Sequence, residues 1–279
     1  MTEIINSIFQ GLLLGGLYGL FAAGLSLMFG VMRFINLAHG DFIVAAAFGA
    51  FAIVSATGLN PLVSLVLLVP GFAFAGYCIQ RVVLNRVIGR DIMPGILVTF
   101  GFSVMLQNLM LEVFSANSQR LDAGWLSTAS VTVGSISVGL APLLTFAIAV
   151  ALLGGLGAFL AHTSTGRLLR ATSDDSEAVG LMGADRKHLF ALATALASGI
   201  VALAGVLMAI KTNFDPSAGP IRLLFAFEAV IIGGLGSLWG TLIGGIVLGV
   251  AQGIGAAIDP GYQILAGHVV FLIILVMRP

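Results

Sequence analysis

The feature that most constrains this chain is a series of apolar stretches, each close to the length of a membrane-spanning helix. Crossing a bilayer takes about 20 predominantly apolar residues, and such stretches recur along the whole sequence. Hydrophobic residues make up 59% of the 279 residues and charged residues only 9%, whereas an average soluble domain is about 25% charged. The stretches are continuous rather than alternating, which argues against a β-barrel. The sequence therefore predicts an all-α polytopic membrane protein with one transmembrane domain over residues 1–279.

Proline and glycine divide the apolar sequence into nine candidate membrane segments. Asn60-Pro61 and Pro94-Gly95, for example, mark the starts of two of them. The expected segments cover residues 7–30, 40–57, 61–84, 94–114, 141–161, 189–210, 223–238, 240–258 and 262–277. If the Gly-rich stretch near 233–240 is re-entrant instead, the count falls and the N-terminus changes sides. We therefore expect about 8–9 transmembrane helices.

One polar stretch between two apolar runs, residues 164–188, carries much of the charge of the chain, and we call it the polar island. It contains eight of the 24 charged residues (12 basic and 12 acidic), namely Arg167, Arg170, Asp174, Asp175, Glu177, Asp185, Arg186 and Lys187. Thr172 or Ser173 is expected to cap a short helix whose first turn is acidic. Gly183 can end this helix in a left-handed conformation. Such a helix suits docking to a water-soluble partner; an ordinary solvated loop is the alternative.

Basic residues assign the two sides of the membrane. Arg81, Arg86 and Arg90 lie in one loop, and the polar island is the other basic loop. Two crossings separate these loops, so they share a side, which the positive-inside rule makes cytoplasmic. On the opposite side, alternation around Gly134-Ser135 predicts a small β-hairpin with a two-residue turn.

Two ladders of small residues lie near the C-terminus. Glycines four positions apart expose backbone on a helix face and let another helix approach closely. The ladders consist of Gly236, Gly240 and Gly244, and of Gly245, Gly249 and Gly253. They predict close helix packing, either within the chain or, as the alternative, between subunits.

Three motifs carry a resemblance to a known family. Residues 24–42 read GLSLMFGVMRFINLAHGDF, which closely resembles the signature of the branched-chain amino acid importer permeases, and residues 228–240 read EAVIIGGLGSLWG, a further match. In the polar island, Glu177, Ala178 and Gly183 are similar to the start of the cytoplasmic loop motif of ATP-binding-cassette (ABC) importer permeases, although the later Ile and Leu-Pro positions of that motif are missing. The resemblance covers essentially the whole chain.

The resemblance implies a transmembrane permease subunit of an ATP-driven ABC importer that moves branched-chain or related small amino acids across the bacterial cytoplasmic membrane. The implied partners are a second homologous permease, two cytoplasmic ATP-binding subunits and an extracytoplasmic substrate-binding protein. The polar island would be the ATPase-coupling loop, with a short coupling helix and with Glu177, Ala178, Gly183, Asp185 and Arg186 as its functional residues.

Polar residues within apolar runs are the candidates for the substrate path. Three polar residues, Asn36, His39 and Asp41, lie between two apolar runs. Placing a charged side chain at the bilayer centre costs about 2.5–3.5 kcal/mol on insertion scales. These three residues would form a hinge or pathway segment, or a loop at headgroup level as the alternative. Glu228 is a further pathway candidate, or a structural partner of a neighbouring helix. Thr99, Ser103 and Gln107 share a helix face and either line a path or join helices; Gln107 is the pathway candidate among them.

Other functional classes fit the sequence less well. The four histidines and one cysteine show no metal-ligand spacing, and there is no Gly-rich phosphate loop ending in Gly-Lys-Ser/Thr. We therefore expect no enzyme activity, no cofactor, no metal and no nucleic-acid partner, with ATP hydrolysis on separate subunits. The alternatives are a urea or short-chain amide ABC permease and, further removed, a stand-alone secondary transporter or channel. An intramembrane enzyme is the most distant possibility.

Overall fold

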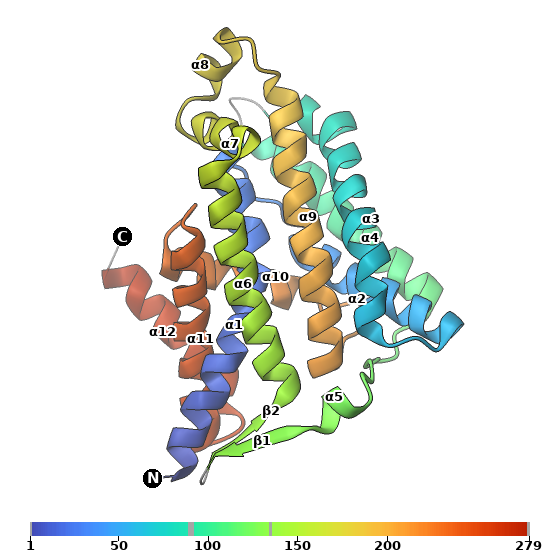
Figure 1. The fold of residues 1–279 in the computed structure, drawn as a ribbon, viewed down its shortest axis with the longest axis vertical. Coiled ribbons are helices and arrows are strands. Elements are labelled where there is room, and N and C mark those ends of the chain that lie inside the picture. The colour runs from blue at the N-terminus through green and yellow to red at the C-terminus, as the bar shows by residue number, and fades with distance from the viewer. Residues whose placement is uncertain (1, 89–91, 134–135, 278–279) are drawn as a thin grey trace.

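The computed structural model describes residues 2–88, 92–133 and 136–277, and these residues form a bundle of helices with one small β-hairpin (Figure 1). Among these residues, seven helices are long and apolar enough to cross a membrane: α1 (Thr2–Met32), α2 (His39–Thr57), α3 (Pro61–Val82), α4 (Met93–Phe114), α6 (Leu140–His162), α9 (Arg186–Lys211) and α11 (Leu238–Ile258). Two shorter helices, α10 (Gly219–Gly233) and α12 (Tyr262–Met277), complete the bundle. The chain is thus an all-α polytopic membrane protein, as predicted.

The remaining elements lie at the two ends of the bundle. One end carries a 3₁₀ turn, η1 (Leu84–Arg86), and two helices of the polar island, α7 (Ser164–Asp174) and α8 (Ser176–Leu181). The other end carries the N-terminus, α5 (Trp125–Thr128) and the strands β1 (Ser130–Val133) and β2 (Ile136–Gly139) (Figure 1). Val133 pairs with Ile136 in an antiparallel register, which confirms the predicted hairpin, although its turn, Gly134-Ser135, lies outside the described residues.

Most helices begin and end close to the expected residues, and the segment expected over 223–238 lies four to five residues nearer the N-terminus. Its helix, α10, begins at Gly219 and ends at Gly233. Gly234 and Gly236 then take positive φ angles of 93° and 82° and turn the chain into α11. At about 1.5 Å per residue, the 15 residues of α10 span roughly 22 Å, which is short of the ~30 Å hydrocarbon core.

Two parts of the chain, α1–α4 and α9–α12, repeat one arrangement with opposite orientation. Each part begins with a long helix, α1 or α9, which is followed by a non-helical connection and then by α2 or α10. The long helix of each part packs on the third helix of the other part, so α1 pairs with α11 and α9 with α3. Because α1 and α9 run in opposite directions (Figure 1), the two parts form an inverted repeat, as in many transporters.

The second glycine ladder, on α11, packs against α1 within the chain. A Cβ atom at Gly249 would lie 2.3 Å from the Gly11 carbonyl oxygen, and one at Gly245 would lie 2.6 Å from that of Gly15. At Gly253 the nearest atom is the Ser7 carbonyl oxygen, at 2.4 Å. Of the two expected uses of this ladder, the intrachain one is therefore observed, and it brings two helix backbones into direct contact.

We predict that Gly249→Ala lowers the thermal stability of the protein. The new methyl group would force α1 and α11 apart, and overpacking of this kind typically costs about 1–3 kcal/mol. The matched control is Gly101→Ala on α4, where a Cβ meets no atom within 4 Å, so its melting temperature should be unchanged or slightly higher because alanine favours helix. Thermal unfolding of the purified protein in detergent measures both. Equal melting temperatures for the two variants would contradict the packing argument.

Candidate functional site

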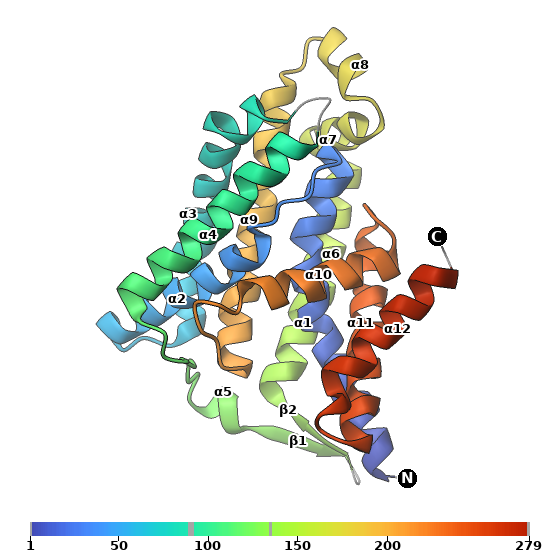
Figure 2. The same cartoon turned by 180° about the vertical axis from the view of Figure 1, so that it is seen from behind.

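The connection between α1 and α2 is non-helical and lies inside the protein. Helix α1 ends at Met32, Arg33 takes a positive φ of 50°, and α2 begins only at His39. Figure 2 shows the connection running from the polar-island end back to α2, which starts at mid-height in the bundle. Asn36, His39 and Asp41 are only 5%, 2% and 1% exposed. The three polar side chains therefore lie inside the bundle.

The side chains of Asn36 and His39 each have a defined hydrogen-bond partner. The Asn36 side-chain oxygen accepts a hydrogen bond from the Ala38 N–H at 3.0 Å, and its carbonyl oxygen accepts one from the His39 N–H at 3.2 Å. The His39 ring Nε2 donates to the Phe21 carbonyl oxygen on α1 at 2.7 Å. Asn36 therefore stabilises the turn just before α2, and His39 holds the first turn of α2 against α1.

On α4, a row of three polar side chains, which we call the polar stripe, contacts the connection and the start of α2. It consists of Thr99, Ser103 and Gln107. Thr99 Oγ1 accepts a hydrogen bond from the Leu37 N–H at 3.2 Å. Ser103 Oγ donates to Asp41 Oδ2 at 2.6 Å, and Gln107 Nε2 donates to Ser103 Oγ at 3.1 Å. The stripe thus joins helices by hydrogen bonds, and it brings two of the sequence-predicted residues, Asp41 and Gln107, to either side of Ser103.

The first turns of α2 and α10 cross with their backbones in contact. A Cβ atom at Gly40 would lie 2.0 Å from the Gly219 carbonyl oxygen, and one at Gly219 would lie 1.9 Å from Asp41 Oδ1. This oxygen has no hydrogen-bond partner within the described part of the chain. The Asp41 carboxylate therefore lies beside the first residue of α10, where the helix dipole favours negative charge.

Glu228 belongs to a different cluster. It lies on α10, is 1% exposed, and its Oε1 is 2.5 Å from the ring Nδ1 of His268 on α12. The Phe225 ring packs on both His268 and Tyr18 of α1, and the Tyr18 hydroxyl donates to Gln252 Oε1 on α11 at 2.6 Å. Sequence reasoning missed these partners, because they lie 40 to 234 positions apart along the chain.

At the polar-island end, the short predicted helix exists, but it is capped by a different residue. Asp175 accepts hydrogen bonds from the N–H groups of Glu177 and Ala178 and starts α8. The expected capping residues, Thr172 and Ser173, lie inside α7 instead. Their hydroxyls donate to the carbonyl oxygens of Leu168 and Gly30, so neither is free to cap, and Asp174 ends α7 rather than belonging to the first turn of α8.

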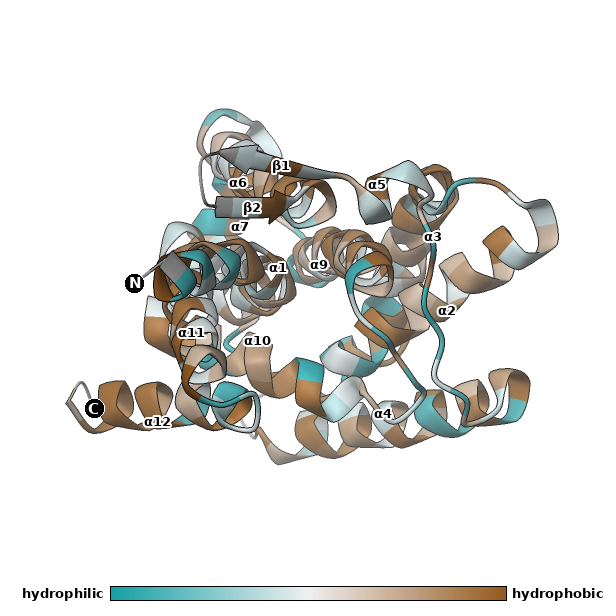
Figure 3. Cartoon of the chain, turned by 90° about the horizontal axis from the view of Figure 1, so that it is seen from below, coloured by the Kyte–Doolittle hydropathy of each residue, from teal (hydrophilic) through white to brown (hydrophobic). Residues whose placement is uncertain are grey.

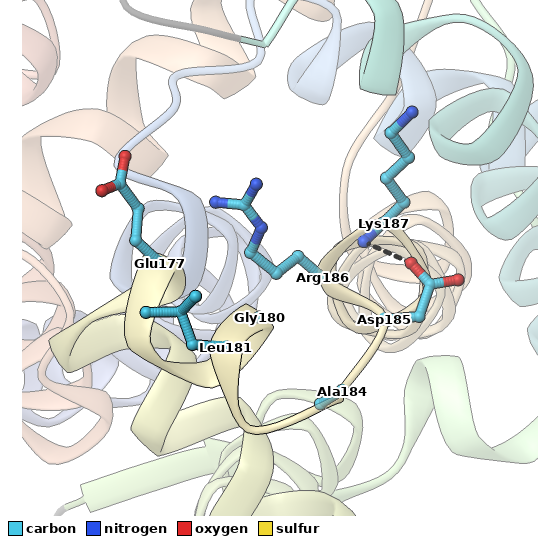
Figure 4. Close-up of a pocket in the computed structure, with 7 residues that line it drawn as sticks. All are labelled: Glu177, Gly180, Leu181, Ala184, Asp185, Arg186 and Lys187. Atoms are coloured by element: carbon cyan, nitrogen blue, oxygen red, sulfur yellow. Dashed lines mark hydrogen bonds between the residues drawn. The ribbon is translucent and has the colours of Figure 1, made fainter.

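The tip formed by the last residue of α8 and the turn after it is apolar and exposed. Gly183 takes a positive φ of 89°, as predicted, and the preceding Leu181 and Met182 are 91% and 74% exposed. Beside this tip is a cleft of about 510 Å³ (Figure 4), lined by Glu177, Gly180, Leu181, Ala184, Asp185, Arg186 and Lys187. An apolar tip next to a charged cleft can pack against another protein while the charges set its orientation.

Asp185 connects the start of α9 to the end of α3. It caps α9 by accepting hydrogen bonds from the N–H groups of Lys187 and His188, and it pairs with Arg81 at 3.0 Å. Desolvation acts to raise the pKa of Asp185, but the hydrogen bonds from His188 and Arg81 and the positive charge of Arg81 outweigh it and lower the pKa. The carboxylate therefore stays ionised at neutral pH.

Helix α7 links the polar-island end to the interior of the bundle. The Ser173 hydroxyl donates to the Gly30 carbonyl oxygen near the end of α1, just before the non-helical connection. A Cβ atom at Gly30 would meet Gly236 at 3.4 Å, in the turn that follows α10. One residue of α1 thus contacts both the polar island and the end of α10.

Comparison with known proteins places this architecture among transport proteins. Residues 7–277 match the family model described as branched-chain amino acid transport system / permease component. The chain is 26% identical over 295 residues to the high-affinity branched-chain amino acid transport system permease protein BraD of Pseudomonas aeruginosa, covering 100% of this chain and 96% of BraD. It is 25% identical over 289 residues to the permease protein LivH of Escherichia coli K12, covering 99% of this chain and 94% of LivH.

A solved structure shares the fold. PsaBC from Streptococcus pneumoniae, determined in complex with a Fab, superposes with a TM-score of 0.52 at 14% sequence identity, covering 95% of this chain and 90% of that one. The family model spans nearly the whole chain, including the non-helical connection before α2, the polar island and the turn after α10. The chain therefore belongs to the family of permease components of branched-chain amino acid transport systems.

Proposed function

We propose that this chain is the transmembrane permease subunit of an ATP-driven ABC importer that moves branched-chain or related small amino acids across the bacterial cytoplasmic membrane. The observation that carries the proposal is the match of residues 7–277 to the permease family. The names of the full-length relatives, high-affinity branched-chain amino acid permeases, support the substrate class.

The expected partners follow from the chemistry that this chain lacks and from the surface that it presents. Its sequence contains no Gly-rich phosphate loop, so ATP would be hydrolysed by two separate cytoplasmic subunits. The exposed tip of α8 and its charged cleft are suited to docking one of them. A second homologous permease and an extracytoplasmic substrate-binding protein would complete the importer.

The mechanism that we propose is alternating access driven from the polar island. Closure of the ATPases would move α8, with Glu177, Ala178, Gly183, Asp185 and Arg186 as the coupling residues. The hydrogen bond from Ser173 to Gly30 offers a direct route for this movement to the end of α1. The non-helical connections would then allow α2 and α10 to tilt. The hinge or pathway residues would be those nearest the crossing of α2 and α10, or on α10 itself: Asn36, His39, Asp41, Gln107 and Glu228.

We predict that leucine uptake depends on the whole assembly. Purified alone in liposomes, the chain should move no leucine under any ion gradient, because the sequence offers no phosphate loop and no complete ion-coupling site. With its permease, ATPase and binding-protein partners, it should accumulate radiolabelled leucine only when ATP is supplied. A complex that carries an inactive ATPase is the matched control.

The other outcomes of this experiment distinguish the alternatives. Gradient-driven uptake by the chain alone would identify a secondary transporter and would contradict the proposal. ATP-driven uptake of urea or acetamide without uptake of leucine, valine or isoleucine would retain the ABC permease assignment but replace the substrate class.

A further inference from the structure

An apolar groove lies beside the crossing of α2 and α10. Its volume is about 290 Å³, and its wall consists of Ile35, Leu37, Ile96, Pro220, Leu223, Leu224 and Phe227. Four of these residues belong to one face of α10, at positions i, i+3, i+4 and i+7. The groove adjoins the crossing directly, since a Cβ atom at Gly40 would lie 2.7 Å from the Leu223 backbone nitrogen.

The groove opens on the face of the bundle that α4 and α10 share. Figure 3 shows α4 and α12 along one edge of the molecule in mostly hydrophobic colouring, with α10 just inside them. Lipid could cover an apolar recess on such a face. The backbone at its rim decides against lipid, because non-helical backbone at membrane depth is tolerated only where protein buries it or where it lines a wet cavity.

Ile35 supplies this backbone. It is half-buried, lines the groove and lies in the middle of the non-helical connection. The hydrogen bonds of the connection run from the N–H groups of Arg33, Leu37 and Ala38. The N–H groups of Phe34, Ile35 and Asn36 have no partner among the described residues, and of these three residues Ile35 lines the groove. A polar group left unpaired in hydrocarbon costs several kcal/mol. The rim therefore requires water or a polar ligand group, while the wall requires an apolar one.

This combination matches one class of ligand. An aliphatic amino acid has an apolar side chain at one end and a charged ammonium and carboxylate at the other. The volume of about 290 Å³ lies just below the roughly 300–1,000 Å³ that is typical of ligand pockets, so it suits a small solute. Every lining side chain is aliphatic, aromatic or proline, and none offers the hydrogen bonds that an amide such as urea would need along its whole surface.

We propose that this groove takes the aliphatic side chain of the transported amino acid at mid-depth in the membrane, with Leu223 and Phe227 setting how large that side chain can be. This inference rests on the proposed transport of amino acids, and it goes further by placing side-chain selection within the permease itself, in addition to any selection by the binding protein.

The test compares uptake of leucine and alanine by the complete complex in proteoliposomes, with the same saturated binding protein throughout. Leu223→Trp should fill the groove and reduce leucine uptake relative to alanine uptake by about tenfold or more, the usual effect of a changed fit in an apolar pocket. Phe227→Ala should enlarge it and raise phenylalanine uptake relative to leucine. The matched control is Val66→Trp on α3, 79% exposed and away from the groove, which should leave both ratios unchanged.

Accessibility gives a second readout that does not need transport. In a Cys78→Ser background, which removes the single native cysteine, Leu223→Cys should react with a small membrane-impermeant thiol reagent, and leucine with its binding protein should slow the reaction. Val66→Cys should react only with a lipid-soluble reagent.

The possible failures can be told apart. Unchanged uptake ratios in both groove variants, with normal leucine uptake by the wild type, would overturn the groove inference and leave the proposed function standing. Reaction of Leu223→Cys only with the lipid-soluble reagent would overturn it as well. Absence of any amino acid uptake by the wild-type complex would instead refute the proposed function, and the labelling of Leu223→Cys would still show whether the groove is wet.

Discussion

Replacing Leu181 with aspartate is expected to uncouple ATP hydrolysis from transport. Leu181 is the last residue of α8 and is 91% exposed, so its side chain contributes little to stability within the chain itself and is available to a partner. An aspartate would carry an unpaired charge into the docking interface. Truncating one of the few hot-spot residues of an interface costs 2 kcal/mol or more, about a 30-fold effect. We propose that Leu181 is such a residue, and we therefore expect leucine uptake to fall by at least that factor.

The measurement is ATPase activity and leucine uptake of the assembled complex in the same proteoliposomes. Val131→Asp is the matched control, because Val131 is an exposed apolar residue, 46% accessible, in the hairpin at the opposite end of the molecule. The control should insert, hydrolyse ATP and transport as the wild type does. Wild-type uptake by Leu181→Asp would show that the tip of α8 does not dock the ATPase.

Replacing Asp41 with leucine is expected to abolish transport while the protein still inserts in the membrane. Asp41 Oδ2 accepts the Ser103 hydrogen bond, and a buried hydroxyl left unpaired costs about 1–3 kcal/mol. The substitution also removes the negative charge beside the first residue of α10, which contributes up to about 2 kcal/mol in partly buried geometries. Both losses fall at the crossing of α2 and α10, which the proposed mechanism requires to move as a defined unit.

Two further variants separate charge from hydrogen bonding. Asp41→Asn keeps an acceptor for Ser103 but loses the charge, so it should retain part of the uptake. Ser103→Ala keeps the charge but removes the donor, and it should also give an intermediate rate. Leucine uptake rates of the assembled complex, normalised to the amount of inserted permease, rank the three variants by activity. Wild-type uptake by Asp41→Leu would return this segment to a passive structural role.

Features that depend on local sequence could be predicted. Apolar length located the long helices, and Asn60-Pro61 marked the start of α3, where the Asn60 side chain accepts a hydrogen bond from the Leu62 N–H. The positive φ of Gly183 and the pairing of β1 with β2 likewise follow from neighbouring residues. These features are set within a few residues along the chain, where glycine, proline and capping side chains act directly.

Features that depend on distant residues could not be predicted. The Glu228–His268 pair and the contact between Gly40 and Gly219 join positions far apart in sequence, and no spacing rule connects them. Helix α7 is different, because a local signal for it exists: the Thr163 side chain accepts a hydrogen bond from the Gly166 N–H. The acidic residues further along the polar island instead suggested a helix cap at Thr172 or Ser173.

The crossing at Gly40 and Gly219 has a consequence for leakage. Two backbones that touch without intervening side chains have nothing flexible between them to absorb a displacement. A shift of α2 must therefore push α10, which points toward the opposite surface of the membrane in the inverted repeat. Under the proposed mechanism, a movement that opens the path at one surface would close it at the other by direct steric contact, so a continuous open pore would require α2 and α10 to separate first.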